Sequence, residues 1–339
     1  MRVLLLGGSG LLSGVAREAF LATGHHVTVV VRGTTPIASH DHLTVRHADR
    51  RDASALAAAI GGERFDLTVD FLGYTGDDVT RLFAVPRFGP GRMVLISTGQ
   101  VYLVTADPRP PFRESAADAP TMPEPEHGTR AWHNWVYGMG KREAEAALLR
   151  AGMEHGVPTL ALRLPVVQGE TDGQASRRLW AWLERMRDGG PVLLPDDGVQ
   201  PVRFVYAGDV GVALLRLAER AAWPIEPALN LAQPSEEPLR SFLERVAACA
   251  GLEPRFVPVT GAELAAAGLD ENCAPYWGRW CSRPDPAAAI AALGFMPRGP
   301  AEYLPSVVAA HLAQPPVESD PGYVTRDREL ALAARLARS

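Results

Sequence analysis

Short apolar runs alternate with longer, helix-like stretches through the first half of the chain. Runs rich in Val, Leu, Ile and Thr predict buried strands at residues 2–6, 26–31, 43–49, 66–73, 92–98 and 159–167. Between them, apolar residues at helical spacing predict helices at 11–23, 53–60 and from about 136 to 150. Alternation of this kind indicates βαβ units. We therefore predict an α/β fold built on a Rossmann-type, doubly wound parallel sheet.

The regular alternation ends near Glu170 and resumes once, where "VRFVYAGDVGVALLRLAE" has the pattern of one more strand and helix. We therefore predict a nucleotide-binding domain, a smaller and discontinuous C-terminal substrate domain, and a polar tail with a short amphipathic helix. The nucleotide-binding domain should comprise residues 1–169 and 202–230. The substrate domain should comprise residues 170–201 and 231–313, and the tail residues 314–339.

The segment after Tyr102 is crowded with proline, which fixes φ and removes a backbone donor. This segment is predicted to be a long loop that is neither helix nor central strand. Long loops in compact domains are often functional. The prolines are Pro108, Pro110, Pro111, Pro120, Pro123 and Pro125.

The composition is that of a soluble globular protein, with 47% hydrophobic and 22% charged residues among 339. A net charge of −5 argues against a basic nucleic-acid face. No apolar run reaches the length of a membrane span, and Val3–Leu6 is too short for a signal peptide. We therefore expect a cytoplasmic protein without nucleic-acid or membrane partners. Three cysteines and scattered histidines lack ligand spacing, so no metal site is expected.

A glycine-rich segment, "LLLGGSGLLSG", follows the first predicted strand and precedes the first helix. Glycine turns the chain tightly there and lets backbone N–H groups approach a pyrophosphate at the positive end of the helix. Ser13 replaces the usual third glycine. The alternative is an ordinary turn, but the position favours a dinucleotide site. The expected contacts are Gly7, Ser9, Gly10, Leu11 and Leu12.

The second predicted strand ends in "VVVRG", where an NAD-preferring site would typically carry an acidic residue. Arg32 could instead pair with a 2′-phosphate, which favours NADP(H) over NAD(H); the alternative is a solvated arginine at a strand end. Asp49 could accept a hydrogen bond from the adenine amino group. The other cofactor contacts that we expect are Arg50, Leu72, Gly73, Lys141 and Pro165.

Lys141 is the only lysine among 34 basic residues, and it follows Tyr137 by four positions. On a helix, residues at this spacing lie on one face. An ammonium favours the phenolate form of a neighbouring tyrosine, and a compact ammonium fits this role better than a planar guanidinium. Since the rest of the chain uses arginine, the exception indicates an acid/base pair. An exposed Tyr–Lys pair without function is the alternative.

A hydroxyl should face the same cleft from a strand end, and "VLISTGQVY" supplies Thr98. Its hydroxyl could orient a substrate oxygen. Ser97 is the neighbouring competitor, and a residue of either type at a strand end is most often structural.

Together these segments resemble the extended short-chain dehydrogenase/reductase superfamily, also called the NAD-dependent epimerase/dehydratase family. "GGSGLL" is similar to its glycine loop, "YGMGK" to its Tyr-x-x-x-Lys, and "STGQVY" to its catalytic Ser/Thr four residues before a Tyr, which selects Thr98. "DFLGYTGDDV" and "STGQVYLV" resemble a divergent branch that includes chloroplast stem-loop-binding-like proteins. The resemblance extends to about residue 313. It implies a homodimer formed through two helices of each subunit.

The sequence departs from the family pattern where substrates are read. Gly99 and Gln100 replace the Asp-Glu that sugar dehydratases carry after the catalytic Thr. Val166 stands where epimerases usually carry Asn, and Arg203 is displaced by one position. These changes argue against a nucleoside-diphosphate sugar. The substrate-binding residues that we expect are Gln100, Asn134, Val166 and Arg203.

Two hypotheses follow from these residues. In the first, the protein is an NAD(P)-dependent oxidoreductase or epimerase that moves hydride between nicotinamide and a secondary alcohol or ketone, sugar-like or a small metabolite. Tyr137 is then the acid/base, Lys141 tunes it and holds the ribose, and Thr98 orients the substrate. In the second, the protein is a non-catalytic NAD(P)-binding regulator or RNA-associated protein on the same fold, because fold alone does not determine function.

Overall fold

The computed structural model describes residues 1–33, 36–171 and 177–338. The chain forms two compact units, each assembled from three segments. The first unit consists of Met1–Pro165, Ala207–Ala232 and Ser282–Pro297. The second consists of Val166–Tyr206, Gln233–Cys281 and Arg298–Ser339.

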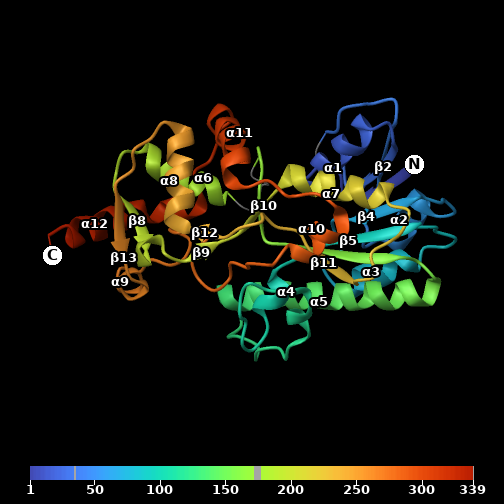
Figure 1. Cartoon of the computed structure of the whole chain (residues 1–339), viewed down its shortest axis with the longest axis horizontal. Coiled ribbons are helices and arrows are strands. Elements are labelled where there is room, and N and C mark those ends of the chain that lie inside the picture. Colours follow the sequence, from blue (N-terminus) through green and yellow to red (C-terminus); the bar gives the residue numbers. More distant parts are fainter. Residues whose placement is uncertain (34–35, 172–176, 339) are drawn as a thin grey trace. The chain divides into compact units, whose positions relative to one another are not determined.

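A sheet of seven parallel strands forms the centre of the first unit (Figure 1). The strand order is β11-β6-β5-β4-β1-β2-β3. From β1 the chain adds β2 and β3 on one side and then β4, β5, β6 and β11 on the other, so the switch point lies between β1 and β4. This order is that of a doubly wound sheet and confirms the predicted fold class. The strands are β1 (Arg2–Leu6), β2 (His26–Val31), β3 (Leu43–His47), β4 (Leu67–Asp70), β5 (Arg92–Thr98), β6 (Thr159–Leu164) and β11 (Ala228–Asn230).

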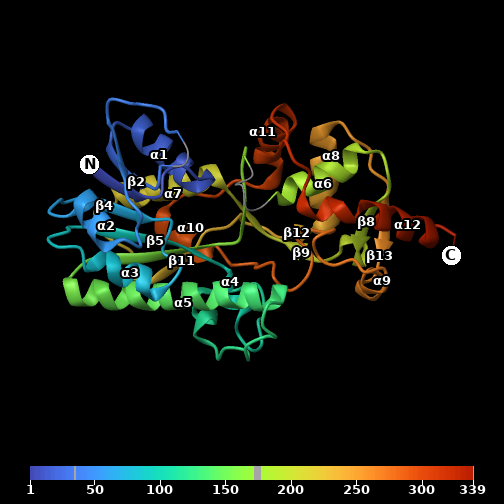
Figure 2. The same ribbon diagram turned by 180° about the vertical axis from the view of Figure 1, so that it is seen from behind.

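Helices cover both faces of this sheet (Figures 1 and 2). α1 (Leu11–Ala22) packs against α7 (Ala207–Glu219) on one face, and α3 (Gly76–Phe83) packs against α5 (Arg130–His155) on the other. The central strands are therefore apolar on both sides, as their sequences predict. The remaining helices of this unit are α2 (Ala53–Ile60), α4 (Gln100–Leu103), the 3₁₀ helix η1 (Glu114–Asp118) and α10 (Ala287–Leu293).

Helix α5 begins six residues before the predicted start near Val136. Thr129 caps it, because its hydroxyl accepts a hydrogen bond from the backbone N–H of Trp132 at 3.1 Å. The aromatic and polar run that follows this cap has only modest helix propensity, so the sequence pattern does not include it in the helix.

The proline-rich loop also differs from prediction, since it contains the helical turn η1.

The predicted strand at 159–167 is divided in the structure. Pro165 lacks a backbone N–H, and it separates β6 from β7 (Val166–Gln168). β6 pairs with β5 in the central sheet, whereas β7 pairs with β10 (Phe204–Tyr206) in the second unit. Pro165 is therefore the last residue of the first segment of the first unit.

The second unit encloses its own apolar core, which includes Trp182, Phe204, Phe242 and Tyr303. Its sheets are small: β7 with β10, β9 with β12, and β8 with β13. The other strands are β8 (Val192–Pro195), β9 (Pro201–Val202), β12 (Glu237–Pro238) and β13 (Phe256–Val259). The helices are α6 (Arg178–Arg187), η2 (Asp196–Gly198), α8 (Leu239–Ala250), α9 (Gly261–Ala266), α11 (Pro300–Ala313), η3 (Pro321–Thr325) and α12 (Arg326–Leu336).

The boundaries of the units differ from the predicted domains in the C-terminal part. The sequence predicts residues 231–313 in one domain, but Ser282–Pro297 belongs to the first unit. The reason is local pairing: Phe112 accepts a hydrogen bond from Asp285 N at 2.8 Å and donates one to Arg283 O at 3.0 Å, and α10 packs on β11. The returning segment begins at Ala207, not at 202, and ends at Ala232.

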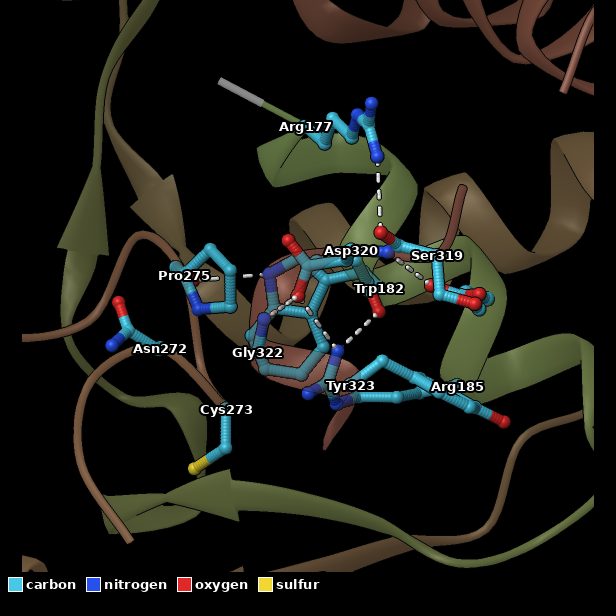
Figure 3. Close-up of polar contacts among 12 residues, drawn as sticks. Arg177, Trp182, Arg185, Asn272, Cys273, Pro275, Ser319, Asp320, Gly322 and Tyr323 are labelled. Atoms are coloured by element: carbon cyan, nitrogen blue, oxygen red, sulfur yellow. Dashed lines mark hydrogen bonds and ion pairs between the residues drawn. The ribbon is translucent and has the colours of Figure 1, made fainter. Parts of the chain in front are cut away.

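The C-terminal tail packs within the second unit. Arg177 donates to the carbonyl of Ser319, and the carboxylate of Asp320 lies 3.6 Å from the guanidinium of Arg185 (Figure 3). Arg185 in turn forms a fully buried pair with Glu329 of α12. No helix in the described part of the chain is long and apolar enough to span a membrane.

Candidate active site

The glycine loop connects β1 to α1 at the carboxyl edge of the central sheet. Gly7 has φ of +97°, a conformation that side chains rarely adopt. At Gly8 a Cβ would lie 2.9 Å from Val29 Cβ of the neighbouring strand. Gly10 is exposed, and a Cβ there would meet only Ser13 Oγ, at 3.6 Å. Gly7 is therefore required by the backbone conformation of the turn, and Gly8 by close packing against β2.

Ser13, which replaces the usual third glycine, closes the loop from inside. Its buried Oγ accepts a hydrogen bond from Gly10 N at 3.1 Å and donates to Gly10 O at 3.3 Å. The departure from the family pattern thus preserves the turn. Gly10 provides no side-chain cap for α1, and the first turn of the helix has no acidic residue. These features fit a phosphate near Leu11 and Leu12, as a dinucleotide requires.

The two predicted arginines lie in different environments. Arg32 follows β2 and is exposed, so its guanidinium is accessible to a 2′-phosphate. Arg50 is buried and its guanidinium binds both carboxylate oxygens of Asp70, at 2.6 and 3.0 Å. Burial opposes the charge of Arg50, but the pair with Asp70 outweighs it and raises the pKa of Arg50. Asp49 is exposed, and its carboxylate accepts from Arg51 N at 2.9 Å. Sequence alone does not distinguish the paired arginine from the accessible one.

The loop after β4 approaches the glycine loop. A Cβ on Gly7 would contact the Leu72 side chain at 3.4 Å. Gly73 is required by packing, because a Cβ there would lie 2.7 Å from Leu95 and 3.0 Å from Asp70 Oδ2. Pro165 is buried at the end of β6. The structure therefore brings Leu72 and Gly73 to the predicted cofactor side of the sheet.

Lys141 of α5 packs near the carboxyl end of β5 and is 2% exposed. Its Nζ donates a hydrogen bond to the carbonyl of Ile96 in β5 at 2.8 Å. Burial lowers the pKa of Lys141 to about 8, although Asp70 and Glu145 oppose the shift. The ammonium is thus held on the sheet at one fixed place.

Tyr137 lies one helical turn before Lys141, and its side chain is 40% exposed. The ring of Tyr74, from the loop after β4, lies beside both residues. Its centroid is 4.7 Å from Lys141 Nζ and 6.4 Å from the Tyr137 ring centroid. The three side chains therefore form one cluster with an accessible phenol.

Thr98 ends β5 and is half-buried. Its Oγ1 accepts a hydrogen bond from Gln100 N at 3.2 Å. The competing residue, Ser97, is buried and its hydroxyl donates to the carboxylate of Glu145. Of the two hydroxyls, that of Thr98 is the accessible one.

The comparisons with known proteins extend these observations. The model of the NAD dependent epimerase/dehydratase family matches residues 3–232, which include the glycine loop, Thr98, Tyr137 and Lys141. The chain belongs to this family. Membership supports a nicotinamide cofactor and an enzyme of the oxidoreductase or epimerase type.

Two curated relatives and one solved structure resemble this epimerase/dehydratase family member. A 2′-dehydrokanamycin reductase from Streptomyces kanamyceticus is 30% identical over 80% of this chain and 72% of its own length. A chloroplast stem-loop binding protein of 41 kDa from Arabidopsis thaliana is 23% identical over 64% and 54%. UDP-glucose 4-epimerase from Thermotoga maritima superposes with a TM-score of 0.69 at 18% identity, covering 92% of this chain and 99% of that chain.

The predicted substrate residues of this family member fall into two groups. In the first unit, Gln100 Nε2 donates to Asn134 Oδ1 at 3.0 Å, so these side chains bind each other. In the second unit, Val166 begins β7, and Arg203 lies between β9 and β10, 3.9 Å from Glu236. Within the described residues, no group of His, Cys, Asp and Glu is arranged to hold a metal.

Two residues near Tyr137 and Lys141 are not identified by the sequence pattern. Tyr74 stands in "DFLGYTGDDV", and an aromatic residue just after a buried strand at the carboxyl edge was the available signal. Glu145 lies one turn after Lys141. Both of its carboxylate oxygens accept hydrogen bonds from Arg163 of β6, and it also accepts one from Ser97. Glu145 therefore ties α5 to two strands of the sheet.

Proposed function

We propose that the protein is an NAD(P)(H)-dependent reductase that converts a ketone on a sugar-like molecule to a secondary alcohol. The observation that carries this proposal is the buried Lys141, the only lysine of the chain, fixed on β5 one helical turn from an accessible Tyr137. The name of the relative from Streptomyces kanamyceticus describes a reduction, and this supports net reduction over epimerisation.

When bound, the reduced nicotinamide would supply a hydride to the carbonyl carbon. Tyr137 would donate its phenolic proton to the carbonyl oxygen, so that C=O becomes CH–OH and the tyrosine becomes a phenolate. The ammonium of Lys141 would stabilise that phenolate, since an opposite charge within a few ångströms favours the ionised form. Thr98 would hold the carbonyl oxygen through its accessible hydroxyl.

The cofactor would lie along the glycine loop with its pyrophosphate at the start of α1. The backbone N–H groups of Leu11 and Leu12 would bind the pyrophosphate, because Gly10 has no side chain that could cap the helix in its place. The accessible Arg32 supports NADPH as the preferred form. Elimination of water is not part of the proposal, because Gly99 and Gln100 provide no carboxylate pair beside Thr98.

Tyr137→Phe tests the proposal directly. The variant keeps the ring but has no proton to donate, so we expect turnover to fall by about 10²- to 10⁴-fold while cofactor affinity stays unchanged. Turnover is measured as NADPH oxidation over a panel of sugar-like ketones, and affinity by calorimetry. Tyr323→Phe is the matched control, since its hydroxyl binds Asp188 in the second unit.

Undiminished turnover in Tyr137→Phe would contradict the assigned role. A wild-type protein that turns over no ketone but binds RNA in a salt-dependent way would favour the non-catalytic alternative. Interconversion of two alcohols without net use of NADPH would identify an epimerase.

A further inference from the structure

The ring of Tyr74 forms a wall over the Lys141 ammonium. Tyr74 is 48% exposed, whereas Lys141 is buried, so of the two side chains in this contact the ring is the one that meets solvent. The Nζ-to-centroid distance of 4.7 Å is within the range of a cation–π contact. The same ring lies beside Tyr137, so the contact is made where the proposed chemistry occurs.

Four charged side chains around Lys141 affect its ammonium, and they come from different elements of the first unit. Asp70 of β4, Asp78 of α3 and Glu145 of α5 favour the ammonium, whereas Arg50 opposes it. Arg50 already neutralises Asp70 through a bidentate pair. Because burial outweighs these carboxylates, the ammonium is only modestly favoured near neutral pH, and a further stabilising contact has a measurable effect.

We propose that Tyr74 is a positioning residue: the face of its ring, not its hydroxyl, holds the Lys141 ammonium beside Tyr137. A cation–π contact depends on the quadrupole of the ring, which phenylalanine shares. Leucine would keep a smaller apolar side chain at this position but has no π face. Comparing these two replacements therefore separates the effect of the aromatic ring from the effect of an apolar side chain at the same place. The use of the contact in catalysis rests on the proposed function, but the contact itself does not.

The single lysine gives a direct measurement. Protein made with lysine labelled with ¹³C at Cε contains one labelled residue, so its NMR spectrum has one lysine Cε signal. The chemical shift of that signal follows the protonation of Nζ. We expect a titration midpoint near pH 8 in the wild type and in Tyr74→Phe. In Tyr74→Leu the midpoint should fall by about half a unit to one and a half units.

Phe83→Leu is the control, because it removes a ring at the far end of α3 that stacks on His155. It should leave the midpoint unchanged. Tyr74→Met repeats the loss of the ring with a different apolar cover, in case the leucine variant folds poorly. An unchanged or raised midpoint in both variants, or an equal fall in Tyr74→Phe, would overturn the proposal.

This titration is independent of turnover. Failure of the proposed reductase activity would leave the midpoints as expected, and a failed titration would leave the Tyr137→Phe result intact. If both proposals hold, Tyr74→Leu should lower kcat with little change in the Kd of the cofactor. Tyr74→Phe should behave as the wild type.

Discussion

Burial of the Lys141 ammonium carries a cost in stability. Its pKa in the folded protein is about 8, compared with 10.5 for an ordinary lysine, because the ammonium is desolvated. Between these values the unfolded chain binds a proton that the folded chain does not. Stability contributed by this residue therefore rises with pH from about 8 to 10.5, and the burial cost is fully present at lower pH.

Lys141→Met should reveal this cost. The stability of the wild type relative to the variant should rise by up to about 3 kcal/mol as the pH increases from 7 to 10.5. The measurement is the free energy of unfolding by denaturant at several pH values. Arg142→Met is the control, since an arginine does not titrate in this window. A pH-independent difference between wild type and Lys141→Met would contradict the buried ammonium.

Arg32 makes a second prediction at the scale of one residue. Arg32→Asp should weaken NADPH binding by about 10- to 100-fold and weaken NADH binding less, because a charge-assisted bond to the 2′-phosphate is lost. Calorimetric titration with both cofactors checks this. Arg64→Asp, at an exposed arginine before β4, is a matched change of charge. Tighter binding of NADH than NADPH by the wild type would overturn the assignment.

Single residues can be predicted best where spacing along one helix decides the geometry. Tyr137 and Lys141 can be paired from their separation of four, because helical periodicity fixes which face they share. Tyr74 cannot be found in this way. Its position beside Lys141 depends on the packing of α3 against α5, which brings the loop before α3 next to a helix that is distant in the sequence.

At the scale of elements, the buried pair of Arg185 and Glu329 joins α6 to α12. Both side chains are almost fully buried, and the two hydrogen bonds between them are 2.9 and 2.8 Å long. The amphipathic pattern of the sequence predicts the tail helix. It does not predict this pair, because two charged residues 144 positions apart have no shared pattern.

Glu329→Gln should therefore destabilise the second unit by about 3 kcal/mol, since it removes the nearer charge partner of the buried Arg185 and leaves only the carboxylate of Asp320, 3.6 Å away. Replacing both residues by methionine should cost less, because neither charge of the fully buried pair is then left without the other. Denaturant unfolding measures both variants. Glu244→Gln, at a half-exposed pair with Arg240, should change stability by less than about 1 kcal/mol. Equal effects of Glu329→Gln and Glu244→Gln would contradict a structural role for the tail.

At the scale of the whole molecule, the outer face of α5 exposes apolar side chains. Leu149 and Met153 are one turn apart, and Met153 is 69% exposed. The homodimer implied by the family would bury such residues. We expect Leu149→Glu with Met153→Glu to convert a dimer to a monomer, as measured by light scattering. Ile225→Glu, at another exposed apolar residue, is the control.

A wild-type protein that is monomeric at micromolar concentration would rule out this dimer. Equal dissociation by Ile225→Glu would show that the effect is not specific to α5.

The parallel sheet and its order of elements can be predicted from the sequence, but the return of Ser282–Pro297 to the first unit cannot. That return depends on pairing with Phe112 in a loop without periodicity.

The interleaved segments of the two units bear on how the chain folds during its synthesis. When the ribosome has passed residue 281, the first unit still lacks α10, and the second still lacks α11 and α12. Arg185 then has no Glu329 to neutralise it, and β11 has no α10 beside it. A chain interrupted at this point would carry the Tyr137–Lys141 pair in a first unit whose core is unfinished. Such a fragment would expose apolar surface that the complete chain buries, and this surface would make it a target for chaperones and proteases.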